Sequence, residues 1–324
     1  MPISVSRPIA SGCIVACAVA LAFPAVAGAA KFKTVGADLR VVGPQGQTLA
    51  QQVQYTGTAQ IPTDPNATCF GQGTGGSGAK VKIAGPTALG QVQDASKVTR
   101  DLKPLSVTDA FEFGLGVCGI GGFATSGSSS WYVKSNHVGS QVGADQIVVG
   151  KDDEILWYLA PSFPYPSELG LEGPRTTKPN SDVEVSALAY DDAGNRSPAA
   201  GATVSGGSAP VTTDAQGNAT ASVGSKDVAL QATSGSLIPS EELELCVAGN
   251  ARECSPQTLV EGTGKRDKMF GTPVADRIKA RAADDVVKAR GGGPDKINCG
   301  KGRRDVAYVK ADDVTRACEK VKVQ

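Results

Sequence analysis

The stretch WYVKSNHVGSQVGADQIVVGKDDEILWYLAP, residues 131–161, contains both tryptophans and the only histidine of this 324-residue chain. Its first and last segments, Trp131–Val133 and Glu154–Leu159, have the alternating pattern of β-strands. Both faces of the second segment are apolar, with Ile155, Trp157 and Leu159 on one face and Leu156 and Tyr158 on the other. We therefore expect this strand at the centre of a sheet rather than at its edge.

Composition favours small β-rich modules over a large helical enzyme. The chain has 40 glycines and 19 prolines, and only 5% of its residues are aromatic. Glycine and proline supply the turns that many short strands require. A chain of 324 residues is long enough for two or three domains. The sequence therefore predicts a multi-domain, mainly β protein.

The N-terminal segment predicts export. Arg7 is followed by an apolar run of 18 residues, CIVACAVALAFPAVAGAA, which ends in small residues. A short positive region, an apolar core and a small-residue end are typical of a secretory signal peptide, which we assign to residues 1–29. As a membrane anchor the run is barely long enough. We expect a secreted or cell-surface protein with no membrane span in the mature chain.

Removal of the signal peptide leaves an even number of cysteines, which favours disulfides outside the cytoplasm. Six cysteines allow 15 pairings. Neighbouring pairs fall within the modules described below, and none has the spacing of a zinc or redox motif. The economical pairing is therefore Cys69–Cys118, Cys246–Cys254 and Cys299–Cys318.

The first module covers residues 31–163. Segments 37–42 and 47–57 are expected to be strands around a Gly-Pro turn, and segment 79–86 a further strand. Segment 105–114, LSVTDAFEFG, is expected to be a short helix, because Ser106 can cap it, Asp109 follows in the capping-box position and a glycine ends it.

The end of this module carries a resemblance to a known family. WYVKSN, a glycine in VGADQ, and KDDEILWY resemble the transcobalamin-like C-terminal domain, a small α+β, β-grasp-like module of secreted bacterial proteins and cobalamin carriers. The resemblance implies a bridge between Cys69 and Cys118. It also implies a surface for a flat ligand, such as a sugar or a corrin ring, with these candidate binding residues: Trp131, Tyr132, Asn136, Trp157 and Tyr158.

The same aromatic residues are expected to serve a structural role as well, because they can fill a small core. The carriers hold cobalamin between this module and a helical domain that has no counterpart in this sequence. Indoles that line an open groove would favour a carrier, whereas buried indoles argue against one.

Residues 175–250 form the second module, between linkers at 164–174 and 251–261. Short apolar runs at spacings of 8–12 residues, separated by turn clusters such as DDAGN and TDAQGN, predict a β-sandwich. The segment GATVSGGSAPVTTDAQGNATASV resembles bacterial Ig-like surface domains, which implies a spacer role.

The tail, residues 262–324, contains a repeat. Five aspartates recur at intervals of nine or ten residues, each with an apolar residue two positions on: Asp267, Asp276, Asp285, Asp295 and Asp305. The pattern resembles the hemolysin-type nonapeptide repeat, which implies a short parallel β-roll and calcium bound at these aspartates. Lys265, Val274 and Ala283 replace a glycine of the family pattern, and Gly293 alone retains it, so calcium binding is in doubt.

The tail is also basic. Residues 262–324 contain 16 Lys and Arg against 9 Asp and Glu, which gives +7 and leaves −7 for the rest of a neutral chain. Phe270 and Tyr308 are its only aromatic residues, fewer than nucleic-acid binding by stacking would use. We expect cell-wall polymers or another surface protein as partners, and no nucleic acid.

Catalytic residues are not evident. His137 has no nucleophile or second histidine at a recognisable spacing, so we expect it in a solvent-exposed loop. The acidic cluster 152–154 lies where a turn between strands is expected. The Gly-rich segment 71–80 lacks the Lys-Ser/Thr of a phosphate-binding loop. The sequence therefore favours a non-enzymatic binding or adhesion protein, with an extracellular small-molecule carrier as the alternative.

Overall fold

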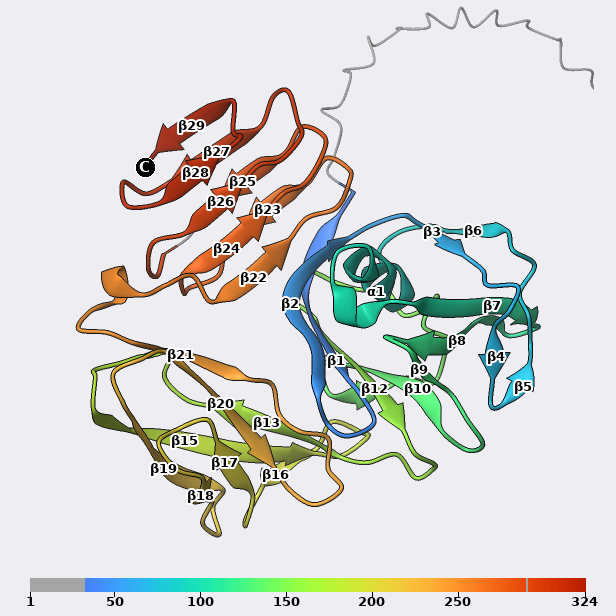
Figure 1. The fold of residues 1–324 in the computed structure, drawn as a ribbon, viewed down its shortest axis with the longest axis horizontal. Coiled ribbons are helices and arrows are strands. Elements are labelled where there is room, and N and C mark those ends of the chain that lie inside the picture. The colour runs from blue at the N-terminus through green and yellow to red at the C-terminus, as the bar shows by residue number, and fades with distance from the viewer. Residues whose placement is uncertain (1–32, 290) are drawn as a thin grey trace, which may run out of the picture. The chain divides into compact units, whose positions relative to one another are not determined.

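The computed structural model describes residues 33–289 and 291–324. The predicted signal peptide lies outside the described residues. Within them the chain is mainly β, with one α-helix, as predicted. This helix is too short to cross a membrane. Figure 1 shows the strands arranged in several sheets.

The first module is built on a five-strand segment of one sheet, in the order β11-β10-β12-β1-β2. These strands are β1 (Val35–Val42), β2 (Thr48–Thr56), β10 (Ser130–Ser135), β11 (Val138–Gly139) and β12 (Glu154–Ala160). Strand β12 runs parallel to β1 and antiparallel to β10. The prediction that 154–159 is a central strand is therefore confirmed, whereas 147–149 forms only an isolated bridge to Thr87.

Three smaller sheets complete this module. They consist of β3 (Ala59–Pro62) with β6 (Lys80–Ile83), β4 (Thr68–Cys69) with β5 (Gln72–Gly73), and β7 (Leu105–Phe111) with β8 (Gly114–Ile120) and β9 (Phe123–Ala124). The helix α1 (Ala88–Ser96) and a short 3-10 helix, η1 (Arg100–Leu102), lie between them in sequence. Helix α1 packs against β2 and β3, so its buried face closes the core around Trp157.

The helix prediction for 105–114 is wrong. These residues form β7 and the turn to β8, because the β-branched and aromatic side chains of VTDAF suit a strand and Glu112–Phe113 make a two-residue turn. Gly114 follows with φ +128, a conformation that favours glycine. The actual helix, α1, is capped by Thr87, whose hydroxyl accepts the N–H of Gly90 at 3.2 Å.

The second module consists of two sheets around one apolar core, as expected for a sandwich. One sheet contains β13 (Glu168–Glu172), β15 (Ser181–Tyr190), β16 (Arg196–Pro198) and β19 (Asn218–Val223). The other contains β14 (Thr176–Thr177), β17 (Thr203–Ser205), β18 (Val211–Thr212), β20 (Val228–Thr233) and β21 (Leu243–Val247). The expected linker 164–174 contains β13, so the module begins before residue 175.

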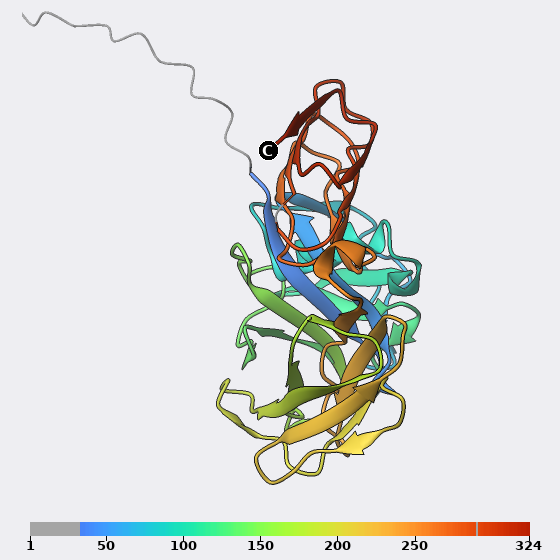
Figure 2. The same cartoon turned by 90° about the vertical axis from the view of Figure 1, so that its left-hand side faces the viewer.

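The tail is a parallel β-roll, which we call the roll. One of its two stacks contains β22 (Thr258–Glu261), β24 (Asp276–Lys279), β26 (Lys296–Asn298) and β28 (Val314–Arg316). The other contains β23 (Lys268–Phe270), β25 (Val286–Lys288), β27 (Val306–Val309) and β29 (Lys320–Val323). Figures 1 and 2 show these strands in the orange-to-red part of the chain. The apolar residues predicted from the repeat are all buried between the stacks: Met269, Ile278, Val287, Ile297 and Ala307.

The roll and the first module share one sheet. Strand β22 pairs in parallel with β2, through Val53 with Val260 and Gln54 with Glu261. The result is a nine-stranded sheet that runs from β11 to β28. The expected linker 251–261 therefore contains a structural joint, together with the 3-10 helix η2 (Ala251–Glu253).

The cysteine pairing predicted from the sequence is confirmed in full. Cys69–Cys118 joins β4 to β8, Cys246–Cys254 joins β21 to the end of η2, and Cys299–Cys318 closes the last coils of the roll. The three bridges stabilise the first module, the start of the joint and the free end of the roll, and they do so mainly by restricting the unfolded chain.

Candidate functional site

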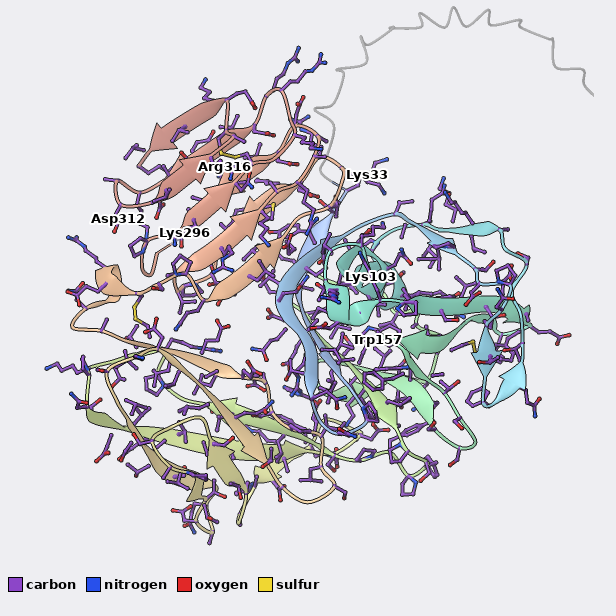
Figure 3. The ribbon with its side chains drawn as sticks, viewed as in Figure 1. Lys33, Lys103, Trp157, Lys296, Asp312 and Arg316 are labelled. Atoms are coloured by element: carbon purple, nitrogen blue, oxygen red, sulfur yellow. A yellow bond between two sulfur atoms is a disulfide. The ribbon has the colours of Figure 1, made fainter. Side chains whose placement is uncertain are left out.

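Both tryptophans lie in the core of the first module. The side chain of Trp131 is 8% exposed and that of Trp157 is 1% exposed, so neither indole forms an open surface. The Trp131 indole N–H donates to the carbonyl of Phe123 at 2.9 Å, which fixes the ring against β9. Figure 3 labels Trp157 within the first module. Their main role is therefore packing.

Of the other three predicted binding residues, Tyr132 and Tyr158 lie side by side on neighbouring strands, with ring centroids 5.7 Å apart, whereas Asn136 lies apart from them. Tyr158 is buried on the face opposite the tryptophans, against Val42 and Ile238. Asn136 closes the turn after β10, where its side chain donates to Asp153 at 3.0 Å and accepts the N–H of Glu154 at 2.9 Å. Only Tyr132 reaches the surface groove described next.

An aromatic groove lies beside β10 and the tip of the β7–β8 turn. A cavity of about 170 Å³, with Trp131 and Trp157 in its wall, adjoins an open groove of about 700 Å³. Tyr132, Phe113 and Val142 line both. Eight of the 16 aromatic residues of the chain line these two spaces: Phe70, Phe111, Phe113, Trp131, Tyr132, Trp157, Phe163 and Tyr165. We call this surface the aromatic groove.

Several rings of the groove are exposed and held by one another. The side chain of Phe113 is 66% exposed and that of Phe163 is 81% exposed, and Phe111 and Phe113 stack with their centroids 4.9 Å apart. Tyr132 stacks on Tyr165 at 3.8 Å. Exposed apolar residues that gather in one place, rather than singly, mark an interaction surface.

Polar groups edge the groove on one side. The hydroxyl of Tyr132 donates to the carbonyl of Ser140 at 3.1 Å and lies 3.3 Å from the Asp192 carboxylate. Burial, and then the charge of Asp192, raise the pKa of Tyr132 to about 12, so the hydroxyl keeps its proton. Gln141 and Gln146 add amide groups to the lining. This set can bind a ligand by stacking and hydrogen bonding.

Sequence reasoning named Trp131, Tyr132 and Trp157 but missed the exposed rings of this groove, because those rings come from separate loops. The only local signal is the pair Phe111 and Phe113 on either side of a turn residue. Phe70 follows β4, and Phe163 and Tyr165 lie after β12, so their meeting is a product of the fold.

His137 is not in a solvent-exposed loop, which corrects the expectation from the sequence. Its Nδ1 lies 2.6 Å from Glu168 Oε1 and its Nε2 lies 3.4 Å from Glu154 Oε2. Its ring stacks on Tyr190 with centroids 3.7 Å apart. Burial lowers the pKa of His137, but the hydrogen bond that its ring donates to Glu168 and the charge of Glu154 outweigh burial and raise the pKa.

Arg40 extends this arrangement into what we call the junction cluster, made of Arg40, His137, Glu154 and Glu168. Arg40 is 3% exposed; its guanidinium donates to the carbonyl of Pro239 at 2.6 Å and lies 3.4 Å from Glu168. Glu168 begins β13, so the cluster joins the first module to the second. Buried charges persist only when paired, and here Glu168 of the second module pairs with Arg40 and His137 of the first.

The five aspartates predicted as calcium ligands are fully buried at the starts of the roll's strands. Asp285 Oδ1 accepts the N–H of Asp267 at 2.8 Å, and Asp305 Oδ1 accepts the N–H of Asp285 at 2.7 Å. Asp295 does the same for Asp276 at 2.8 Å. We call this series the aspartate ladder; Asp313 and Glu319 continue it at the free end.

Burial raises the pKa of the ladder residues. The pKa of Asp276 is raised to about 6, that of Asp295 to about 7 and that of Asp285 to about 8. Within the described residues, the second carboxylate oxygen of Asp285, Asp295 and Asp305 has no hydrogen-bond partner. A protonated carboxyl group suits such a place better than a carboxylate.

These residues do not fit calcium. Calcium takes six to eight oxygen ligands, and the described part of the chain holds no group of three or more acidic, histidine or cysteine side chains placed for a metal. At the one repeat that retains its glycine, the Lys310 ammonium donates to the carbonyls of Gly292 at 3.2 Å and Gly293 at 2.7 Å. It also lies 3.8 Å from Asp313. A cation from the chain itself thus occupies these oxygens.

Comparison of the chain with protein-family models, curated proteins and solved structures gave no match. The resemblances to the transcobalamin-like, Ig-like and hemolysin-type families therefore stay predictions.

Proposed function

We propose that this chain is an exported, non-enzymatic binding protein that holds its ligand in the aromatic groove. The observation that carries the proposal is that eight of the 16 aromatic side chains line two adjoining spaces, and that Phe113 and Phe163 are largely exposed there. Exposed aromatic rings such as Phe113 and Phe163 lower solubility, and this chain has few aromatic residues. Their exposure is therefore best explained by a ligand that covers them.

The chemistry of the groove favours a ligand with flat apolar faces and polar edges, which describes a sugar ring. Aromatic faces supply contact area, while Tyr132, Gln141 and Gln146 supply hydrogen bonds at the edge. The open form of the groove suits one or two rings of a longer chain. This supports a role in binding or adhesion at a surface.

The small-molecule carrier is the weaker candidate. The smaller of the two spaces measures about 170 Å³, whereas pockets that bury a drug-sized ligand measure about 300–1,000 Å³. A corrin ring therefore does not fit inside it. The buried indoles of Trp131 and Trp157 also argue against a carrier that uses the tryptophans directly.

Export is part of the proposal. Three disulfides suit an oxidising compartment, and the pattern of residues 1–29 adds a signal peptide. The second module, joined to the first through Arg40 and Glu168, would then act as a support that holds the groove in a fixed orientation.

The test is saturation-transfer NMR on the full mature chain with neutral hexasaccharides of glucose and of N-acetylglucosamine. We expect transfer from protein aromatic protons to at least one sugar. Phe113→Ala with Phe163→Ala should abolish it. Val148→Ala is the matched control, because Val148 is 72% exposed but lies outside the groove. Absence of transfer to every sugar, or equal loss in the control, would contradict the proposal.

A further inference from the structure

The two aromatic residues of the tail lie in one row with lysines. In the sheet β23-β25-β27-β29 the register places Phe270 beside Lys288, Lys288 beside Tyr308, and Tyr308 beside Lys322. The inward positions of the first three strands are the buried Met269, Val287 and Ala307, so the row is on the outer face. We call it the outer row.

Contacts along the outer row link each ring to an ammonium. Lys288 Nζ lies 5.4 Å from the centroid of the Tyr308 ring and Lys322 Nζ lies 4.8 Å from it. Lys322 also donates to the Tyr308 hydroxyl at 3.2 Å. Lys268 lies 5.6 Å from the ring of Phe270. These are cation–π distances, which orient the lysines over the face of the sheet.

No acidic residue occurs in the four strands of this sheet. Their sequences are KMF, VVK, VAYV and KVKV, which contain four lysines and no Asp or Glu. Hydrogen bonding from Lys322, followed by its charge and those of other lysines, lowers the pKa of Tyr308, as a positive field requires. The outer row itself therefore carries positive charge that attracts anions.

The outer row has a two-strand repeat. Adjacent strands lie about 4.8 Å apart, so the two rings, and likewise Lys288 and Lys322, are separated by about 9.6 Å. Aromatic rings thus alternate with lysines along the row. The distance from one aromatic ring to the next is close to the length of two linked pyranose rings. A polymer in which sugar rings carry carboxylate groups presents the complementary alternation.

We propose that the outer row binds an acidic polysaccharide, laid across the strands so that its sugar rings contact Phe270 and Tyr308 and its carboxylates pair with Lys288 and Lys322. The three disulfides favour a compartment in which polysaccharides are the common polyanions. The site is separate from the aromatic groove.

The opposite stack of the roll provides an internal control. Its outer face carries Arg277, Lys279, Lys296 and Arg316 but no aromatic residue within strands β24, β26 and β28. Figure 3 labels Lys296 and Arg316 on this stack. Removal of two charges from either face changes the net charge of the protein equally. General charge attraction would therefore weaken equally in the two variants, whereas specific binding at the outer row would weaken only when the charges of that row are removed.

The experiment measures binding of polygalacturonate oligomers to the full mature chain at low salt, with a single-stranded oligonucleotide and neutral dextran as competitors. We expect Lys288→Ala with Lys322→Ala to weaken binding about tenfold, because two exposed charge contacts of about 0.7 kcal/mol each amount to one factor of ten. Phe270→Leu with Tyr308→Leu should weaken binding while leaving the charge unchanged. Lys296→Ala with Arg316→Ala should change it less than about threefold.

Other outcomes would overturn the inference. Equal losses for the two faces would reduce it to nonspecific charge attraction, and tighter binding of the oligonucleotide would assign the row to nucleic acid. Absence of polygalacturonate binding at low salt would remove it altogether. Binding that persists in the Phe113→Ala, Phe163→Ala variant separates this result from the fate of the aromatic groove.

Discussion

The first module and the roll share one sheet, yet they are built in different ways. In the roll, each contact is repeated after one coil, so Asp267 binds Asp285 and Asp285 binds Asp305. In the first module, Trp157 packs among residues drawn from strands and a helix that are far apart in the chain. Regular repetition gives the roll flat faces, whereas irregular connection gives the first module a groove.

The largest expected effect on stability comes from a substitution in the core of the first module. Trp157→Ala should lower the free energy of unfolding by about 3–5 kcal/mol, the range for loss of a buried aromatic side chain. Because β22 pairs with β2, the roll should lose protection in the same transition. Urea denaturation combined with hydrogen exchange measures both quantities.

A surface control separates packing from general disturbance. Phe163 is 81% exposed, so Phe163→Ala should change the free energy of unfolding by less than about 0.5 kcal/mol. If roll amides stay protected while those of the first module exchange, the shared sheet does not couple the two regions.

The next effect concerns the junction cluster. Glu168→Ala removes the nearer acidic partner of Arg40 and of His137, and should cost about 3 kcal/mol because the buried Arg40 then has only Glu154, 3.9 Å away, as an acidic partner among the described residues. Glu172→Ala, on the exposed end of the same strand, should have little effect. Thermal unfolding compares the two variants; equal losses would show that the cluster adds nothing beyond the strand itself.

The cluster also predicts a dependence on pH. The folded state raises the pKa of His137 above its ordinary value of 6.5. A group with a raised pKa binds its proton more tightly in the folded state, so its stabilisation is complete below pH 6.5 and is lost as the pH rises through the folded pKa. The stability difference between the wild type and His137→Asn should therefore be largest below pH 6.5 and shrink as the pH rises through the folded-state pKa. A constant difference would contradict this role.

The smallest effect tests the aspartate ladder. The pKa of Asp285 is raised from 3.8 to about 8 in the folded state. Between these two pH values the aspartate loses its proton in the unfolded chain but keeps it in the folded chain, so the free energy of unfolding falls as the pH rises. Asp285→Asn keeps the hydrogen bond to Asp267 without the charge. It should leave the stability at pH 8 unchanged or raise it by about 1 kcal/mol. Thermal unfolding of this variant and of the surface variant Asp312→Asn checks the direction.

Calcium gives the contrary expectation. If the ladder ligates calcium, millimolar calcium should raise the Tm of the full chain and Asp285→Asn should abolish the rise. The hydrogen-bonding role predicts no rise in either protein. The same unfolding scans, run with calcium and with a chelator, decide between the two.

The repeat explains why the roll could be predicted from the sequence. Aspartates nine or ten residues apart, each followed by an apolar residue, specify both the buried row and the parallel strands. The disulfide pairing followed from the positions of cysteines within modules. Apolar residues on both faces of 154–159 were sufficient to place β12 inside its sheet rather than at its edge.

The functional surfaces could not be predicted in the same way. Phe70, Phe113 and Phe163 come from three separate loops and line two adjoining spaces only in the folded chain. His137 and Glu168 are 31 residues apart and belong to different modules, so no local pattern relates them. The helix prediction for segment 105–114 is wrong because the same polar residues suit both a helix cap and a hairpin turn. Pairing of β7 with β8 stabilises the hairpin instead of the helix.

The joint between β2 and β22 has a consequence for how such a protein can change length. Each coil of the roll templates the next, starting from an edge that the first module provides. Insertion or deletion of a whole coil away from that edge would leave every other pairing intact. The outer row would then lengthen or shorten in steps of about 4.8 Å. The number of coils, counted from the joint with the first module, thus sets the length of the outer row.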